Sequence, residues 1–424
     1  MGYWRYCCLS ATIHDPYLRG PRGLRLTESL QVAPARARGP QQQHAQALDL
    51  PGVICVMAIG IVGSLVVWIT PGLLALCAQQ AGLEDRHLGY TAAWEINMMA
   101  ATIGLSTFLI PRFPWRAVVG FGLSLICLGN LAAGLSHGFE AIVGARATAG
   151  AGEGIAIGYA FAALGRARNP DRVFAIYLFG GGIISSAILL SLPVLQQRAG
   201  AANIFIANAL ITGVVALGLI RFPRGDSHVQ STQRVGAGID WRLASAALVA
   251  VFIYFAAQNA LWSYAERIGQ ASGVGSTQIA RALASATIAG IGGSLLAALL
   301  PRRLGRAWPL TLSSAVSILS FCLLLGQVPA PMFLLSMMLL MGAWCFSQPL
   351  LSGLCCEADP QGRVVCAMAC IQTFGAGFGP AAAAVTLHDH DFSLAVLSGI
   401  ALLAGSHLII LLGISGRSHG LESA

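Results

Sequence analysis

Charged residues are scarce in this chain, and lysine is absent from it. Only 10% of the 424 residues are charged, and all 25 basic residues are arginine. A water-soluble domain carries roughly 25% charged residues, so this chain has too few to cover a water-facing surface. Hydrophobic residues make up 56% of the sequence and the mean hydropathy is +0.71, which indicates that lipid surrounds most of the chain.

Signatures of several other protein classes are missing as well. The run Gly180-Gly-Gly182 lies inside an apolar stretch and no Lys-Ser or Lys-Thr pair follows it, which excludes an ATP-driven pump for this chain alone. The eleven cysteines lie mostly in apolar stretches, and Cys366 and Cys370 have no histidine or carboxylate at ligand spacing. We interpret the His388-Asp-His-Asp391 run as a solvated external turn. We therefore expect no cofactor, no metal and no enzymatic activity.

Twelve apolar stretches separated by short polar breaks follow Pro51. A helix of about 20 residues, rising ~1.5 Å per residue, crosses the ~30 Å hydrocarbon core of a bilayer. The predicted fold class is therefore an all-α integral membrane protein with twelve transmembrane helices. These helices are predicted at residues 52–78, 89–110, 117–135, 140–165, 173–195, 203–222, 242–264, 277–300, 308–327, 331–354, 364–386 and 393–414.

Arginine placement predicts the orientation of these helices. Fourteen arginines lie in the breaks after the even-numbered helices and in the C-terminal tail, whereas the alternate breaks hold three, with Arg281 just inside the eighth helix. Basic residues concentrate on the cytoplasmic side of membranes. We therefore expect both termini in the cytoplasm and the protein in a bacterial-type inner membrane. The net charge of +8 arises from these loops and from the N-terminal tail, and we expect no nucleic-acid partner.

The chain looks duplicated. At an offset of 190 residues, Leu109 to Arg112 corresponds to Leu299 to Arg302, and Arg116 corresponds to Arg306. Two pseudo-symmetric six-helix bundles joined by a central loop form the parallel-repeat plan of a large class of transporters. The predicted units are a disordered cytoplasmic tail or mis-assigned start at 1–49, an N-terminal bundle at 50–222, a cytoplasmic linker at 223–241, a C-terminal bundle at 242–416 and a tail at 417–424.

Charged residues deep inside predicted helices are informative, because a charge at the bilayer centre costs at least ~2.5 kcal/mol. Arg146 and Glu153 stand seven residues apart and so share one face of the fourth helix. Glu95 lies in the second helix at a depth similar to that of Arg146. We expect a Glu95–Arg146 ion pair, which either takes part in proton coupling or only holds its half together. Glu153 has no obvious partner and is the better candidate for a proton carrier, with a structural hydrogen bond as the alternative.

A polar and aromatic stripe recurs every four residues along the seventh predicted helix. Amide and carboxyl side chains on one face are expected to point into the bundle rather than at lipid. Aromatic side chains at this spacing often serve only as packing, but interleaved amides favour contacts with a solute. The predicted substrate-binding residues of this stripe and of its counterpart in the tenth helix are Tyr254, Gln258, Asn259, Trp262, Trp344 and Gln348.

Residues at the ends of several helices are candidates for gating. Glu266 and Arg281, at the external ends of the seventh and eighth helices, are expected to form a gate pair or only an interfacial ion pair. The Thr70-Pro71-Gly72 run and the run from Gly375 to Pro380 predict bends that open and close during transport, or packing kinks.

Two short runs resemble motifs of the major facilitator superfamily. The run Arg303-Leu-Gly-Arg306 is similar to the family's Asp-Arg-x-Gly-Arg loop signature, and the run from Arg146 to Gly152 is similar to its Arg-x-x-Gln-Gly-x-Gly pattern. The resemblance covers residues 50–416 and implies that Arg146 takes part in proton coupling. We also assign Arg303 and Arg306 to gating. The Gly-Pro pattern of the family's drug exporters is missing from the fifth helix.

The sequence thus predicts a secondary active transporter that takes up a small organic solute, such as an organic acid or a short peptide, together with protons by alternating access. Proton-antiport efflux of drugs or metabolites is the alternative. A non-transporting membrane sensor is favoured less, because sensors usually append a soluble signalling module. The expected partners are the solute, protons and the lipid bilayer, and the protein is expected to be a monomer.

Overall fold

The computed structural model describes residues 50–167, 170–224, 239–300, 305–326, 328–359, 363–387 and 391–422, and the repetitive secondary structure in these ranges is entirely helical. The predicted tail 1–49 and most of the predicted linker, 225–238, lie outside the described residues. The predicted domain boundaries therefore stay predictions. In chain order the elements are α1 (Leu50–Ala81), α2 (Asp85–Leu109), α3 (Trp115–Leu135), α4 (Phe139–Leu164), α5 (Pro170–Ala216), η2 (Leu217–Ile220), α6 (Trp241–Ala271), α7 (Ser276–Leu299), α8 (Ala307–Cys322), α9 (Ala330–Ala358), α10 (Arg363–Thr386) and α11 (Ser393–Glu422).

The long element α5 contains two of the predicted helices. At Gly200 its backbone takes φ 76° and ψ 163°, a conformation that glycine adopts readily because it has no Cβ, and the chain bends there. The part before Gly200 contains the helix predicted at 173–195. The part after it, with η2, contains the helix predicted at 203–222. With α5 counted as two, the described residues form the twelve helices that the sequence predicts.

Eight of the described helices are long and apolar enough to cross a membrane by length and composition, with α5 counted once. The helices α2 and α4 are not among the eight, although they have 25 and 26 residues. These two helices carry Glu95, Arg146 and Glu153. The remaining helix, α8, is apolar but has only 16 residues. Buried charge rather than short length therefore distinguishes α2 and α4 from the other helices.

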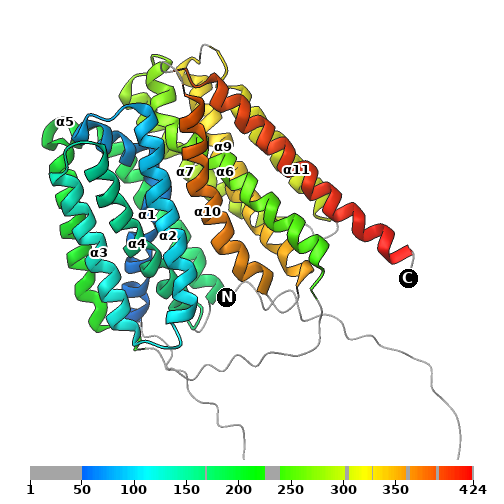
Figure 1. The fold of residues 1–424 in the computed structure, drawn as a ribbon, viewed down its shortest axis with the longest axis horizontal. Helices are drawn as coiled ribbons and strands as arrows, with labels where there is room; N and C mark the ends of the chain where they lie inside the picture. Colours follow the sequence, from blue (N-terminus) through cyan, green and yellow to red (C-terminus); the bar gives the residue numbers. More distant parts are fainter. Residues whose placement is uncertain are drawn as a thin grey trace, which may run out of the picture.

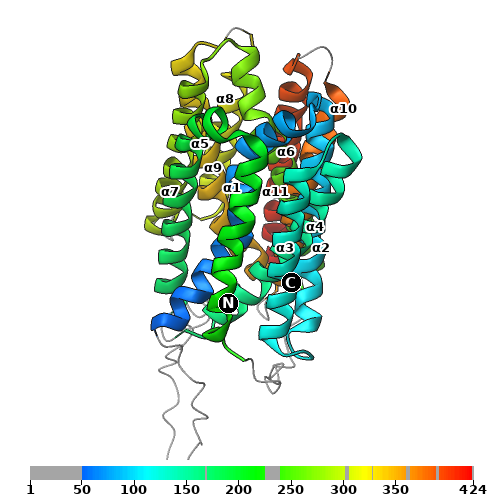
Figure 2. The same ribbon diagram turned by 90° about the vertical axis from the view of Figure 1, so that its left-hand side faces the viewer.

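The helices pack as two bundles (Figures 1 and 2). In the first bundle, α4 packs against α1, α2 and α3, and α3 also packs against α5. In the second, α6 packs against α10 and α11, and α9 packs against α7 and α8. The two bundles meet where α2 packs against α10, α5 against α7 and α1 against α6. We call this contact region the seam.

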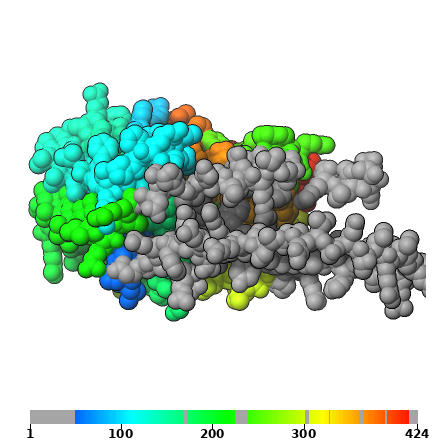
Figure 3. Space-filling model, turned by 90° about the horizontal axis from the view of Figure 1, so that it is seen from below, coloured from blue at the N-terminus to red at the C-terminus, as the bar shows by residue number. Residues whose placement is uncertain are grey.

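The two ends of the molecule are named here from the predicted orientation. The outer end is the one where α1 meets α2 and α6 meets α7, and the inner end is the opposite one. At the inner end of the first bundle, η2 packs against α3, and Figure 3, which views this end, shows the cyan surface of the α2–α3 region beside green surface from later in the chain. There the Nε of Arg116 donates a 2.6 Å hydrogen bond to the carbonyl of Phe222, and the backbone N–H of Trp115 bonds to the carbonyl of Arg224 at 3.4 Å.

Glycines allow the closest helix contacts in both bundles. A Cβ at Gly150 of α4 would collide with the backbone of Glu95 in α2, and a Cβ at Gly379 of α10 would collide with the backbone of Ala256 in α6. Small residues at such positions let membrane helices approach closely. In α4 this approach also brings Glu95 within reach of Arg146.

Hydrogen bonds cross the seam in its outer half and near its middle. The indole Nε1 of Trp262 donates to the carbonyl of Val67 at 3.0 Å, and the hydroxyl of Tyr264 donates to the carbonyl of Asp85 at 2.9 Å. Closer to the middle, the hydroxyl of Ser186 in α5 bonds to α7. These bonds hold the two bundles together from the middle of the seam to its outer end.

Candidate functional site

A buried cluster of charged and amide side chains lies inside the first bundle. Arg146 of α4 forms a bidentate ion pair with Glu95 of α2. The Nε of Arg146 donates to Oε2 at 3.1 Å, and its Nη2 donates to Oε1. Both side chains are about 1% exposed. The sequence predicted this pair from the matching depths of the two residues, and the structure confirms the contact.

Glu153 belongs to the same cluster. Its Oε1 lies 3.6 Å from Nη2 of Arg146, so the expectation that Glu153 has no partner was wrong. Seven residues along α4 place Glu153 two turns from Arg146 on the same face, and the long arginine side chain spans that distance. The second carboxylate oxygen of Glu153, Oε2, has no hydrogen-bond partner among the described residues.

Two asparagines extend the cluster to two more helices. The Nη1 of Arg146 donates to Oδ1 of Asn130 in α3 at 3.0 Å, and Nδ2 of Asn208 in α5 donates to the same oxygen at 3.0 Å. The Nδ2 of Asn130 bonds to the carbonyl of Ile126 at 2.9 Å. Sequence reasoning missed both asparagines, although an asparagine inside an apolar stretch is itself a signal because its amide needs partners in lipid.

The cluster holds two carboxyl groups and one guanidinium group. With both carboxyl groups ionised, the buried site would carry one uncompensated negative charge. Glu95 already bonds through both oxygens to Arg146, whereas Oε2 of Glu153 is unpartnered. The arrangement can therefore take up one proton on Glu153 and become neutral, a reaction that suits a proton carrier.

The polar stripe of α6 points partly into the interior of the second bundle. The amide Nε2 of Gln258 donates to the Tyr254 hydroxyl and to the Ser317 hydroxyl, both at 2.9 Å, and the Tyr254 hydroxyl donates to Ser347 at 3.1 Å. These serines belong to α8 and α9. Tyr254 and Gln258 are thus engaged with the bundle's own side chains, and their predicted contact with a solute stays a prediction.

The other predicted substrate-binding residues have different surroundings. Asn259 is fully buried and its Nδ2 bonds to the carbonyl of Phe255 at 3.1 Å, while its Oδ1 has no partner among the described residues. Trp344 packs edge-on against the ring of Phe255, with centroids 5.8 Å apart. Trp262 bonds across the seam, as described above. Gln348 is half-buried in α9. The structure therefore does not bring the six residues together at one point.

The predicted gating residues also separate. Glu266 accepts a 3.0 Å hydrogen bond from Gln270, and Arg281 is exposed and forms no ion pair with a residue that the structure describes. The expected Glu266–Arg281 pair is therefore not formed. Arg306 bonds to Glu357 and, at 3.2 Å, to the carbonyl of Leu350, so that it ties the start of α8 to the end of α9. Arg303 lies outside the described residues.

An ion pair that the sequence did not predict crosses the seam at the outer end. The Nε of Arg267 in α6 lies 3.3 Å from Oδ1 of Asp85, the first residue of α2. The side chains are 25% and 13% exposed. Nothing in the sequence placed these two residues together, because 182 positions separate them and the packing of α2 beside α6 comes only from the fold.

Twelve helices in two bundles, most of them long enough to cross a membrane, with a buried charge cluster inside one bundle, are typical of membrane transporters. The chain matches the family model of the Major Facilitator Superfamily over residues 52–384, and it belongs to this family. Comparison with curated protein sequences gives no match.

Solved transporter structures share this fold. An inward-open structure of the xylose transporter XylE from E. coli is 12% identical, with a TM-score of 0.64, and the match covers 83% of this chain and 94% of that one. A point mutant of the nucleoside transporter NupG is 12% identical, with a TM-score of 0.70 and coverage of 85% and 99%. A D-xylose-proton symporter is 15% identical, with a TM-score of 0.65 and coverage of 84% and 96%. Identities at this level show a common fold and nothing more specific.

Proposed function

We propose that this protein is a secondary active transporter that couples the uptake of a small organic solute to protons by alternating access. The observation that carries the proposal is the buried cluster of Glu95, Arg146 and Glu153, in which carboxyl groups outnumber cations. A proton on Glu153 makes the cluster neutral, and its loss leaves a net charge whose burial costs at least ~2.5 kcal/mol. Proton occupancy therefore depends on whether Glu153 is reached by water or sealed in the bundle, and alternating access changes that exposure.

The two bundles supply the movement. Alternating access requires the bonds across the outer part of the seam to break while contacts form at the inner end. α4 carries Arg146 and Glu153 and packs against α1 and α2, and both of these helices contact the second bundle. A change of charge at Glu153 therefore acts on helices that form the seam. Because one chain holds the cluster and both bundles, we propose that it works as a monomer in the inner membrane, with both termini in the cytoplasm.

The charges in the Glu95–Arg146–Glu153 cluster bear on the class of solute, because they decide whether a cation is free to bind it. An organic acid or a short peptide carries a carboxylate, which calls for a cationic partner. The guanidinium of Arg146 bonds to Glu95 and Asn130 instead. The structural relatives named above are transporters of xylose or of nucleosides, which are uncharged and carry hydroxyl groups. We therefore place a neutral, hydroxyl-bearing solute ahead of an organic acid or a peptide.

Solute-driven proton flux in proteoliposomes tests this proposal. The purified protein is reconstituted with a pH-sensitive dye in the lumen, and xylose, uridine, a dicarboxylate and a dipeptide are added outside in turn. A proton-coupled carrier acidifies the lumen when its solute enters, and a protonophore abolishes accumulation of that solute. Absence of acidification with every solute, from protein that shows a cooperative thermal unfolding transition, contradicts the proposal.

A further inference from the structure

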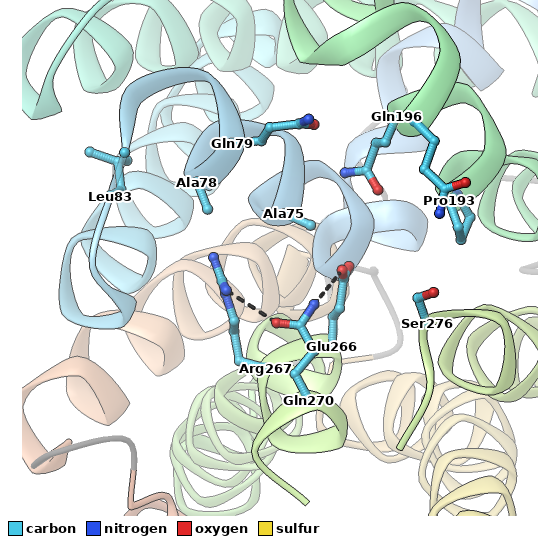
Figure 4. A pocket seen from close by; sticks show the side chains of 12 residues that line it. Ala75, Ala78, Gln79, Leu83, Pro193, Gln196, Glu266, Arg267, Gln270 and Ser276 are labelled. Atoms are coloured by element: carbon cyan, nitrogen blue, oxygen red, sulfur yellow. Dashed lines mark hydrogen bonds between the residues drawn. The ribbon is translucent and has the colours of Figure 1, made fainter. Parts of the chain in front are cut away.

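A cavity lies at the outer end of the molecule, between the two bundles (Figure 4). Its volume is about 470 Å³, and residues of α1, α5, α6 and α7 line it. Small-molecule sites in proteins measure about 300–1,000 Å³, so the cavity has room for a molecule of the size of a monosaccharide or a nucleoside. The charge cluster of the first bundle is not part of its lining.

The cavity sits on the outer side of the bond that closes the seam. On α1, Gln79 lies three helical turns beyond Val67, and on α6, Glu266 and Gln270 lie one and two turns beyond Trp262. Residues four apart on a helix share one face, so Glu266 and Gln270 continue the face of α6 on which Trp262 meets α1. A solute in the cavity would therefore lie on the outer side of the Trp262–Val67 hydrogen bond.

Amide groups dominate the polar part of the lining. Gln79 of α1 and Gln196 and Gln197 of α5 form no side-chain hydrogen bond with a residue that the structure describes, and Ser276 of α7 adds a hydroxyl to the lining (Figure 4). Each amide offers two N–H donors and one acceptor oxygen. A hydroxyl group both donates and accepts, so a cluster of amides from two helices matches a solute with several hydroxyl groups.

The two charged side chains of the lining, Glu266 and Arg267, are linked through an amide. Gln270 stands between them: it accepts from Nη1 of Arg267 at 3.1 Å and donates to Oε1 of Glu266 at 3.0 Å (Figure 4). Arg267 is also paired with Asp85. The guanidinium of the lining is thus already engaged, and the cavity offers no free cation to an anionic solute.

We propose that this cavity is an outer binding site for a small neutral solute with several hydroxyl groups, which it holds before the seam opens. The proposal rests on the transport function proposed above, because a site at the mouth of the seam delivers its solute to a carrier. Gln79 and Gln196 approach the solute from the first bundle and Gln270 from the second. The bound solute therefore contacts both bundles, and its affinity depends on the distance between them.

Protection of a substituted cysteine tests the site in the full chain. In right-side-out vesicles, Gln79→Cys is modified with a membrane-impermeant thiol reagent in the presence of D-xylose, uridine, gluconate or an amino acid. We expect D-xylose or uridine to slow the modification in a saturable manner, and gluconate to have no effect. Adding Gln196→Ala should raise the half-protecting concentration about fivefold, as expected for one lost hydrogen bond. Gln278→Cys, on the exposed first turn of α7 outside the cavity, serves as the matched control.

Several outcomes would overturn the site. These are absence of protection by every neutral solute, equal protection at Gln278→Cys, protection by the charged solutes only, or protection that Gln196→Ala leaves unchanged. Failure of the site is distinguishable from failure of the transport function. Solute-driven proton flux without protection at Gln79→Cys removes the outer site alone, whereas protection without any flux removes the transport function and leaves the cavity as a binding site.

Discussion

The indole N–H of Trp262 donates a 3.0 Å hydrogen bond to the carbonyl of Val67, and Pro71 is the residue that leaves this carbonyl available. In a regular helix the N–H of residue 71 would bond to the carbonyl of residue 67, but proline has no N–H. Thr70 also bonds to this carbonyl, at 3.2 Å, through its hydroxyl. A proline inside one bundle thus provides the acceptor for a donor of the other bundle.

Loss of this donor should loosen the outer end. Trp262→Phe keeps an aromatic ring but removes the N–H. Because a hydrogen bond contributes about 1 kcal/mol net, we expect the population that is open at the outer end to rise about fivefold. The measurement is the rate at which an impermeant thiol reagent modifies Val66→Cys, which is buried beside the bond.

Trp94→Phe is the matched control, because Trp94 is exposed on α2 and should leave the rate unchanged. An unchanged rate in Trp262→Phe would mean that the bond does not hold the outer end closed.

The Asp85–Arg267 ion pair should act in the same direction but more weakly. Its partners are partly exposed, and such pairs contribute about 0.2–1 kcal/mol. Asp85→Asn and Arg267→Gln should each open the outer end slightly, with a double-mutant cycle giving a coupling energy in that range. Arg281→Gln should have no effect, because Arg281 has no ion pair among the described residues. A coupling energy of zero in low salt would rule out a gating role for the pair.

Glu95 and Glu153 should differ in what their loss does to stability. Glu95→Gln removes the bidentate carboxylate partner of Arg146, and breaking a buried ion pair costs about 3–5 kcal/mol. Glu153→Gln keeps the Glu95–Arg146 pair and can still bond through its amide. We expect a lower thermal unfolding temperature and lower yield for Glu95→Gln only. Equal unfolding temperatures in the two variants would contradict the assignment of Glu95 as the main partner of Arg146.

The close contact of α2 with α4 gives a matched pair of glycine variants. A Cβ at Gly150 would meet the backbone of Glu95, which cannot yield as a side chain does, whereas nothing lies within 4 Å of a Cβ at Gly144. Gly150→Ala should therefore force the helices apart and destabilise the protein by about 1–3 kcal/mol. Gly144→Ala should be neutral. Thermal unfolding in detergent distinguishes them, and equal behaviour of the two variants would contradict the packing described here.

The sequence predicted those features that depend on one helix or on matching depths. The twelve helices follow from the length of the apolar stretches, and the Glu95–Arg146 pair follows from two opposite charges that each need a partner in lipid. Glu153 was misjudged because its distance to Arg146 depends on how the arginine side chain extends, which periodicity does not give.

Features that depend on the packing of distant helices were out of reach. The serines of α8 and α9 that bind Tyr254 and Gln258 could not be matched to α6 from its own pattern. The Asp85–Arg267 pair and the Trp262–Val67 bond both cross the seam, and the register of one bundle against the other is set by many contacts together. The role of Pro71 could be predicted only in part. The Thr70-Pro71-Gly72 run predicted a bend, whereas the structure shows a continuous α1 in which the carbonyl of Val67 accepts a hydrogen bond from the other bundle.

The proton carried by Glu153 is the central claim, and uptake in proteoliposomes with and without an imposed pH gradient tests it most directly. Glu153→Gln keeps the shape and the hydrogen-bonding capacity of the side chain but cannot bind and release a proton. We predict that gradient-driven accumulation of the solute is lost while downhill exchange of the solute persists, and that Glu140→Gln, on the exposed first turn of α4, behaves like the unmodified protein. Normal gradient-driven accumulation by Glu153→Gln would contradict the account.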